Sequence, residues 1–82
     1  MDLARRLAES LRRVRREAGL TQTTMAKTLG VSQATLNRLE SGSQNVTLKT
    51  LQQLCRALDC GLDDLFGGQL QWRVRKRRPA HR

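Results

Sequence analysis

The sequence predicts an all-α protein, a compact bundle of five short helices, and three observations lead to that prediction. Apolar residues recur every three or four positions along most of the chain, which places them on one face of a helix. Most of these runs begin near a threonine or serine or end at a glycine, the residues that often start and stop helices. With 82 residues, the chain has room for one modest hydrophobic core and not for a second.

Three helices are predicted outside the middle of the chain from this spacing. Their ranges are roughly residues 2–18, 48–58 and 62–66, and glycines follow the first and the last. Thr47 is the N-cap of the second of them. Every break between helices is a single turn, so residues 1–68 are predicted to form one domain without an internal linker. Residues 69–82 form a C-terminal segment of different character.

Two shorter helices are predicted within TQTTMAKTLGVSQATLNRLESG, residues 21–42. Thr21 is a good N-cap for the first of them, which Gly30 ends, and Ser32 caps the second, which closes at Ser41 and Gly42. The inward-facing residues of the pair are Met25, Ala26, Leu29, Leu36 and Leu39. Two helices of similar length joined by a glycine-containing turn match the helix-turn-helix arrangement, whose second helix can lie in the major groove of DNA.

The period changes after the fifth helix. Leu70, Trp72 and Val74 alternate with polar residues, which is the spacing of a half-buried strand. A lone strand leaves its backbone groups unpaired, and this chain offers no partner strand. We therefore expect the segment to pair with the same strand of a second copy, burying Trp72 across a two-fold axis. Two alternatives stay open: Leu70 and Trp72 fold back on the first or fifth helix, or the segment is disordered.

The charge is strongly positive and unevenly distributed. The formal net charge is +9, and residues 73–82 hold six of the sixteen basic residues and no acidic one. The remaining ten basic and seven acidic residues give residues 1–72 a charge of +3. Such a balance predicts attraction to a polyanion, either nucleic acid or an anionic membrane surface. The basic tail RVRKRRPAHR is predicted to be disordered and to contact phosphates, and it suits an acidic partner protein equally well.

Other classes of protein are disfavoured by what the sequence lacks. No apolar run approaches the roughly 20 residues that span a bilayer, and the N-terminus lacks the apolar region of a signal peptide, so a cytoplasmic protein without membrane contact is expected. Cys55 and Cys60 are expected to be thiols, with Cys55 in the core. Two cysteines and His81 are too few for a metal site, and no set of residues resembles a catalytic constellation. We expect no enzyme, no cofactor and no metal.

The residues also resemble a known family. LTQTTMAKTLGVSQATLNRLESG is similar to the helix-turn-helix of the Cro and phage-repressor family (Xre-like), and the likeness continues through TLKTLQQLCRALDCGLDDLF. It covers about residues 3–67. The resemblance implies a lambda-repressor-like five-helix bundle that binds double-stranded DNA, and it is silent on the DNA sequence that is bound.

Candidate DNA contacts follow from the expected geometry of the second helix of the pair. The positions that face outward on a helix starting near Ser32 are Gln33, Ala34, Asn37 and Arg38. Glutamine can pair with adenine N6 and N7, arginine can pair with guanine O6 and N7, and alanine can touch a thymine methyl group. Backbone amides at helix N-termini suit anions, so phosphate contacts are also expected. The phosphate candidates are Thr21, Gln22, Ser32, Thr35, Asn45 and Thr47.

Two further roles are implied by the family resemblance. Gln22 is expected to contact a phosphate and to buttress Gln33, the first glutamine of the recognition helix. Arg15 and Glu40 occupy the positions at which many family members bury an ion pair between the first helix and the end of the third. We interpret that pair as structural, because it would lock the recognition helix to the scaffold and expose nothing to DNA.

The sequence thus favours a homodimeric transcriptional repressor that reads a pseudo-palindromic operator. The alternative is an antitoxin that also neutralises a toxin protein, because the strand after the helix-turn-helix domain resembles HipB-like antitoxins, whose partner is a kinase-like toxin. This sequence departs from them by ending in a basic tail. A third interpretation, RNA binding, lacks the expected stacking aromatics, since Phe66 and Trp72 are the only two.

Overall fold

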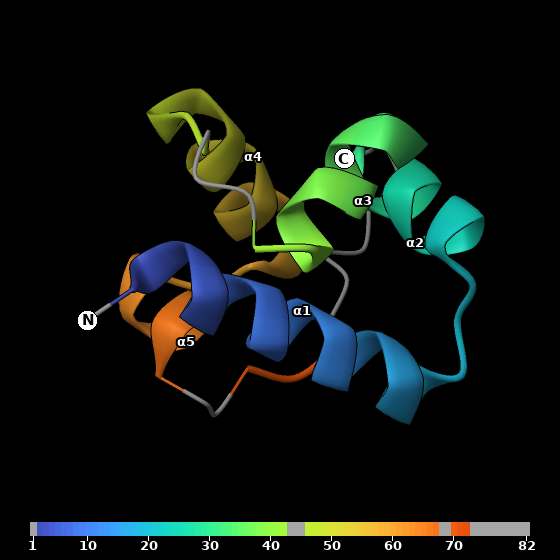
Figure 1. Cartoon of the computed structure of the whole chain (residues 1–82), viewed down its shortest axis with the longest axis horizontal. Helices are drawn as coiled ribbons and strands as arrows, with labels where there is room; N and C mark the ends of the chain where they lie inside the picture. Colours follow the sequence, from blue (N-terminus) through green and yellow to red (C-terminus); the bar gives the residue numbers. More distant parts are fainter. Residues whose placement is uncertain (1, 43–45, 68–69, 73–82) are drawn as a thin grey trace, which may run out of the picture.

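The computed structural model describes residues 2–42, 46–67 and 70–72, and that part of the chain contains five α-helices and no strand (Figure 1). The helices are α1 (Leu3–Ala18), α2 (Gln22–Leu29), α3 (Gln33–Glu40), α4 (Leu48–Leu58) and α5 (Leu62–Phe66). The predicted all-helical fold is confirmed, and the helix bounds agree with the predicted ranges to within about one residue, the usual uncertainty of helix ends.

Side-chain caps fix where four of the helices begin. Thr21, Ser32 and Thr47 each accept a hydrogen bond from the backbone N–H three residues later, at 3.0–3.1 Å. These three caps were predicted. Asp2 caps α1 in the same way, through the backbone N–H of Arg5 at 3.2 Å. Each bond satisfies one of the backbone donors that a helix start leaves without an intrahelical partner.

The turn between α2 and α3 depends on Gly30. Its φ is +77°, in the left-handed region, and a Cβ at this position would lie 2.7 Å from Gln53 Nε2. That nitrogen donates to the carbonyl oxygen of Leu29 at 3.0 Å, which ties α4 to the end of α2. The left-handed φ favours glycine here, and a Cβ would displace the Gln53 amide that bonds to Leu29.

Helix α4 ends without a glycine. Asp59 takes the left-handed conformation with φ 53°, and the N–H of Cys60 bonds to the carbonyl oxygen of Cys55 at 3.0 Å. This is the bonding of a Schellman motif, which brings Cys55 and Cys60 together at the corner between α4 and α5. The pKa of Cys60 is raised to about 12, mainly by burial. The negative charges of Cys55, Asp64 and Asp59 and the hydrogen bond with Cys55 raise this pKa further. Burial also raises the pKa of Cys55.

The core consists mostly of leucines from all five helices. Its largest fully buried side chains are Leu7, Leu11, Val14, Met25, Leu29, Leu36, Leu54, Leu58 and Leu65. Helix α1 runs along one side of the molecule and packs against α3 and α5, while α2 packs against α3 and α4 (Figure 1). The packing of α1 against α3 is the contact that positions the candidate site.

Residues 70–72 lie against the chain's own core. The side chain of Leu70 is 2% exposed, and Arg13 Nη2 donates to the carbonyl oxygen of Leu70 at 2.8 Å. Trp72 is half-buried against the same core. Residues 70–72 form no strand within the chain and have the placement of the fold-back alternative. Val74 lies outside the described residues, and pairing of this segment between two copies stays a prediction.

Candidate nucleic-acid interface

Helix α3 separates its apolar and polar residues onto two faces. Leu36 and Leu39 are 0% and 4% exposed and point into the core. The four residues predicted to contact bases all lie on the exposed face, and they are Gln33, Ala34, Asn37 and Arg38. The buried face fixes how α3 sits on the domain, so its exposed face is presented as a rigid surface.

The predicted phosphate contacts fall at the starts of three helices. Thr21, Ser32 and Thr47 are the N-caps of α2, α3 and α4, and all three are exposed. Thr35 is half-buried in the first turn of α3, where its hydroxyl oxygen accepts from the Ser32 hydroxyl at 2.8 Å. Helix starts carry unpaired N–H groups and the positive end of the helix dipole, so these positions suit anions.

Two of the residues predicted to contact phosphate, Gln22 and Asn45, are not among the exposed N-cap residues that the structure describes. Gln22 opens α2, but its side chain is half-buried and takes part in the hydrogen bonds around Glu40. Its backbone N–H lies in the first turn of the helix, where such groups have no intrahelical partner. Asn45 lies outside the described residues.

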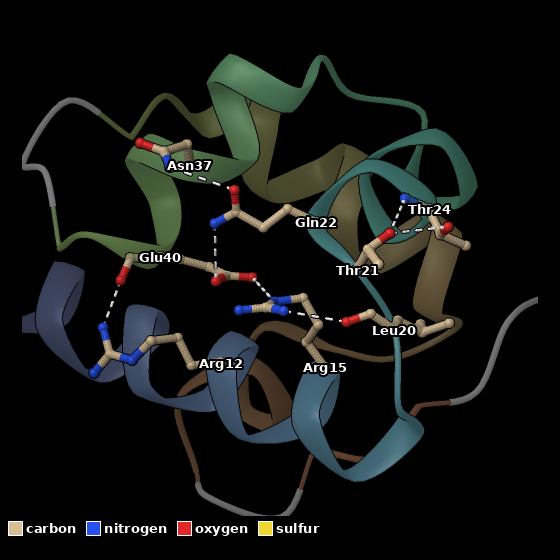
Figure 2. Close-up of polar contacts among 8 residues, drawn as sticks. All are labelled: Arg12, Arg15, Leu20, Thr21, Gln22, Thr24, Asn37 and Glu40. Atoms are coloured by element: carbon tan, nitrogen blue, oxygen red, sulfur yellow. Dashed lines mark hydrogen bonds and ion pairs between the residues drawn. The ribbon is translucent and has the colours of Figure 1, made fainter.

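A buried carboxylate lies at the end of α3, beneath the exposed face (Figure 2). Glu40 is 5% exposed, and Arg15 Nε donates to Glu40 Oε2 at 2.8 Å. Arg15 Nη1 also donates to the carbonyl oxygen of Leu20 at 3.1 Å. The ion pair therefore joins α1, the α1–α2 turn and α3 at one point.

A second arginine of α1 ties down the same end of α3. Arg12 Nη1 donates to the backbone carbonyl oxygen of Glu40, one of the carbonyls that the helix end leaves without an intrahelical partner (Figure 2). A cation at this position also interacts favourably with the negative end of the helix dipole. Arg12 and Arg15 together hold the end of α3 to α1.

The side-chain amides on this surface have partners that the sequence did not reveal. Gln22 Nε2 donates to Glu40 Oε1 at 3.2 Å, and Gln22 Oε1 accepts from Asn37 Nδ2 at 3.3 Å (Figure 2). Gln33 Oε1 instead accepts from the hydroxyl of Thr23 at 3.0 Å. The resemblance implied that Gln22 buttresses Gln33, whereas in this structure Thr23 supports Gln33 and Gln22 supports Asn37.

Sequence reasoning missed Thr23 and the second role of Gln22. A signal was available for Thr23, because it is a polar residue in the first turn of α2, next to Gln22. The contact of Gln22 with Asn37 had no such signal, since it depends on how closely α2 and α3 pack and on the side-chain rotamers.

The described residues hold neither a cluster of metal ligands nor a membrane-spanning helix. Within residues 2–42, 46–67 and 70–72, no three of His, Cys, Asp or Glu cluster in a way that would hold a metal ion. None of the helices in this part of the chain combines the length and the apolar character needed to cross a membrane. Every buried side-chain nitrogen or oxygen among the described residues has a hydrogen-bond partner.

Comparison with known proteins points to one family. The Helix-turn-helix family model matches residues 11–65, more than half of the chain. An uncharacterized HTH-type transcriptional regulator of Sinorhizobium fredii, y4dJ, is 41% identical over 58 residues, which are 71% of this chain and 75% of that protein. Antitoxin HipB of Escherichia coli (strain K12) is 34% identical over 56 residues, 68% of this chain and 64% of HipB.

A third relative extends the comparison. Antitoxin HigA1 of Mycobacterium tuberculosis is 41% identical over 59 residues, which are 72% of this chain and 40% of HigA1. The chain therefore spans less than two thirds of the length of either antitoxin. The matched region includes the end of α1 and the whole of α2, α3 and α4, which carry the buried ion pair and the exposed face of α3. The chain belongs to the Xre-like helix-turn-helix family.

Proposed function

We propose that this protein is a cytoplasmic, sequence-specific DNA-binding regulator of transcription, a repressor that acts as a homodimer on a pseudo-palindromic operator and has no enzymatic activity. The observation that carries the proposal is the division of α3 into a buried apolar face and an exposed face bearing Gln33, Asn37 and Arg38. These side chains match the hydrogen-bonding groups of base edges, and α3 is the second helix of the helix-turn-helix pair, the one that can lie in the major groove.

The exposed side chains have distinct chemical preferences. Arg38, in the last turn of α3, can donate two hydrogen bonds to guanine O6 and N7. Gln33, in the first turn, can pair with adenine, and Ala34 can touch a thymine methyl group. A good two-bond pair discriminates against the wrong base by about 1–3 kcal/mol. Replacing Arg38 by alanine should therefore relax the preference at one base pair in each half-site.

Dimerisation is the part of the proposal that concerns the C-terminal segment. A palindromic site is read by two recognition helices related by a two-fold axis, so a second copy is required. Trp72 is half-buried and leaves part of its large apolar surface for that copy. Trp72→Ala should give monomers at micromolar protein concentration, whereas Gln71→Ala, a change at the exposed neighbouring residue, should leave the dimer intact. Analytical ultracentrifugation decides, and a dimer that persists in Trp72→Ala would refute this seam.

A second candidate function is an antitoxin that neutralises a toxin protein and represses its own operon. It is favoured by two relatives that are named antitoxins, HipB and HigA1. The test is to co-express the chain with the product of the neighbouring gene. Rescue of growth by co-expression and a stable complex of the two purified proteins would support the antitoxin function. If co-expression leaves growth unchanged and the two purified proteins elute separately in gel filtration, the antitoxin function is excluded for that pair.

Selection from a randomised DNA library tests the main proposal. The full chain should enrich a symmetric motif whose half-sites lie about one helical turn, 10–10.5 base pairs, apart. In the same selection, Arg38→Ala should lose the preference at one position of each half-site and keep the others. Recovery of unrelated sequences, with no enriched motif, would contradict sequence-specific binding.

A further inference from the structure

We propose that the buried carboxylate of Glu40 fixes the orientation of the Asn37 side-chain amide through Gln22, so that Asn37 presents its carbonyl oxygen to DNA and reads the exocyclic amine of adenine or cytosine. This inference rests on the proposed function, because it requires the exposed face of α3 to meet base edges. It makes Gln22 and Glu40 positioning residues for base reading, beyond the structural role of the ion pair.

The first step is set by the chemistry of the carboxylate. A carboxylate only accepts hydrogen bonds, and Glu40 Oε2 is already bonded to Arg15 Nε at 2.8 Å. Glu40 Oε1 needs a donor of its own, because the side chain is buried away from water. Gln22 supplies that donor through Nε2 at 3.2 Å. The flipped amide would place Gln22 Oε1 against Glu40 Oε1, two acceptors with no hydrogen between them.

The second step follows from the geometry of a planar amide. Since Gln22 Nε2 faces Glu40 at the end of α3, Gln22 Oε1 faces the opposite way, toward Asn37 one turn earlier in the same helix (Figure 2). An oxygen in that position requires a donor, and Asn37 Nδ2 provides it at 3.3 Å. The direction of donation is therefore the same along the chain of groups, from Asn37 to Gln22 and from Gln22 to Glu40.

The third step concerns what Asn37 shows to a ligand. With Nδ2 turned to Gln22, the carbonyl oxygen Oδ1 lies on the other side of an exposed amide (Figure 2). In the major groove the hydrogen-bond donors are adenine N6 and cytosine N4, whereas the edges of guanine and thymine present acceptors. A phosphate offers only acceptors, so this oxygen does not suit the DNA backbone. Adenine adds N7, which can accept the second hydrogen of Asn37 Nδ2.

Gln33 provides an internal contrast on the same helix. Its Oε1 accepts from the hydroxyl of Thr23 at 3.0 Å. A hydroxyl can donate or accept, so Thr23 supports either orientation of the Gln33 amide. A carboxylate has no such freedom, and only Asn37 is connected to one through Gln22. Thr23→Val is therefore the matched control: it cuts an amide contact of α2 with α3 and leaves the link to Glu40 unchanged.

The experiment uses the full chain and the DNA site that it selects from a randomised library. Asn37→Ala identifies the reporting position, which is the base pair whose preference disappears. At that base pair the unmodified protein should prefer adenine or cytosine on the contacted strand by about tenfold or more, and that strand is the one on which a base analogue without the exocyclic amine weakens binding. Gln22→Met should reduce this preference to about threefold or less, because the freed amide can rotate and donate to guanine or thymine acceptors.

Gln22→Met is also expected to weaken binding to all sequences equally, because Gln22 is a predicted phosphate contact. That uniform weakening is separate from the loss of preference at one position. Thr23→Val should keep the preference at the Asn37 position, and any change should appear at the position read by Gln33.

A second variant tests the inference even if Gln22→Met does not fold. Asn37→Asp, at an exposed position, carries only acceptor atoms. It should keep the preference for amine-bearing bases and shift it from adenine toward cytosine. If Asn37 instead reads DNA with its nitrogen, base analogues without the exocyclic amine will leave binding unchanged on both strands and Asn37→Asp will reverse the base preference, which overturns the inference.

The remaining outcomes separate this inference from the proposed function. If no motif is enriched, both fail. If a motif is enriched but Asn37→Ala changes no position, or if the preference survives Gln22→Met, sequence-specific binding stands and the positioning role of Gln22 and Glu40 is overturned.

Discussion

At the scale of single residues, Glu40 is a buried carboxylate at the end of α3 whose polar atoms have partners on two other helices. It is 5% exposed, its two carboxylate oxygens accept from Arg15 and Gln22, and its carbonyl oxygen accepts from Arg12. A buried carboxylate of this kind stabilises the fold only while its partners remain, because an unpaired buried charge is costly. The end of α3 is therefore sensitive to changes on α1.

The first prediction concerns the buried ion pair. Arg15→Met leaves the Glu40 carboxylate without its cation and should lower the free energy of unfolding by about 3–5 kcal/mol. The double variant Arg15→Met/Glu40→Met should recover most of that loss, because both charges are then absent. Urea denaturation followed by circular dichroism measures these two variants and Glu40→Met alone. Losses that add in the double variant would show that the two residues are not energetically coupled.

The residues of the site were predictable to different degrees. The exposed positions Gln33, Asn37 and Arg38 follow from the helical period, because Leu36 and Leu39 fix which face of α3 is buried. The partners of the amides were not predictable. They depend on the distances between α2 and α3 and on side-chain rotamers, which cannot be deduced from the spacing of residues in a sequence.

At the scale of elements, the C-terminal segment shows what an alternating pattern leaves undetermined. The two-residue period of Leu70 and Trp72 predicted apolar side chains on one side of an extended segment, and both residues do contact apolar surface. The period does not say whether that surface belongs to the same chain or to a second copy. In the structure Leu70 occupies the chain's own core.

The second prediction tests the role of Leu70. Leu70→Ala should lower the free energy of unfolding by about 2–5 kcal/mol, because it opens a cavity in the core. Leu48 is 64% exposed, so Leu48→Ala is the matched control and should cost less than about 1 kcal/mol. Urea midpoints at two protein concentrations are the measurement. If the loss in Leu70→Ala changes with concentration, Leu70 stabilises a dimer rather than the core of one chain.

The third prediction concerns the corner between α4 and α5. Burial raises the pKa of Cys60 from the ordinary value of 9.0 to about 12, so the folded protein holds this proton more firmly than the unfolded chain does. Stability from this group is complete below the unfolded pKa and is lost as pH rises from about 9 to about 12. Cys60→Ala removes the titrating group and should lose less stability than the unmodified protein over that range.

Urea midpoints measured at neutral pH and at several values above about pH 9 check this expectation. Parallel decreases for the unmodified protein and Cys60→Ala would contradict a raised pKa at Cys60.

The helices themselves were predictable because each carries its own start or stop signal, such as Thr21 before α2 and Gly30 after it. The end of α4 followed from the apolar stripe alone, since Asp59 does there what a glycine usually does.

At the scale of the whole molecule, we expect charge and fold to contribute separately to DNA binding. The fold presents α3, while six of the sixteen basic residues belong to residues 73–82, which lie outside the described part of the chain. Basic groups that contact phosphates add affinity without sequence preference and make binding depend on salt. The five-helix arrangement was predictable from the sequence as a whole because local signals and the family resemblance agree. The uneven distribution of charge is read directly from the sequence, whereas the molecule that the basic tail contacts does not follow from it.

The fourth prediction separates the two contributions. Replacing the six basic residues of the tail by glutamine, with Val74 unchanged, should reduce the slope of log K against log salt by about 0.9 for each phosphate that the tail no longer neutralises. The base preference of the selected motif should stay the same. A tail with the same residues in shuffled order, Val74 kept in place, is the control and should retain the slope. An unchanged slope in the glutamine variant would place the tail away from DNA.

The most direct test of DNA-binding regulation is a fluorescence anisotropy titration at ~0.15 M salt, where screening is physiological. It compares DNA from upstream of the protein's own gene with scrambled DNA of equal length and composition. We expect the upstream DNA to bind about a thousandfold more tightly or better, as sequence-specific regulators do. Equal, weak and steeply salt-dependent binding to both would mean that charge alone acts, and it would contradict recognition of an operator there by α3.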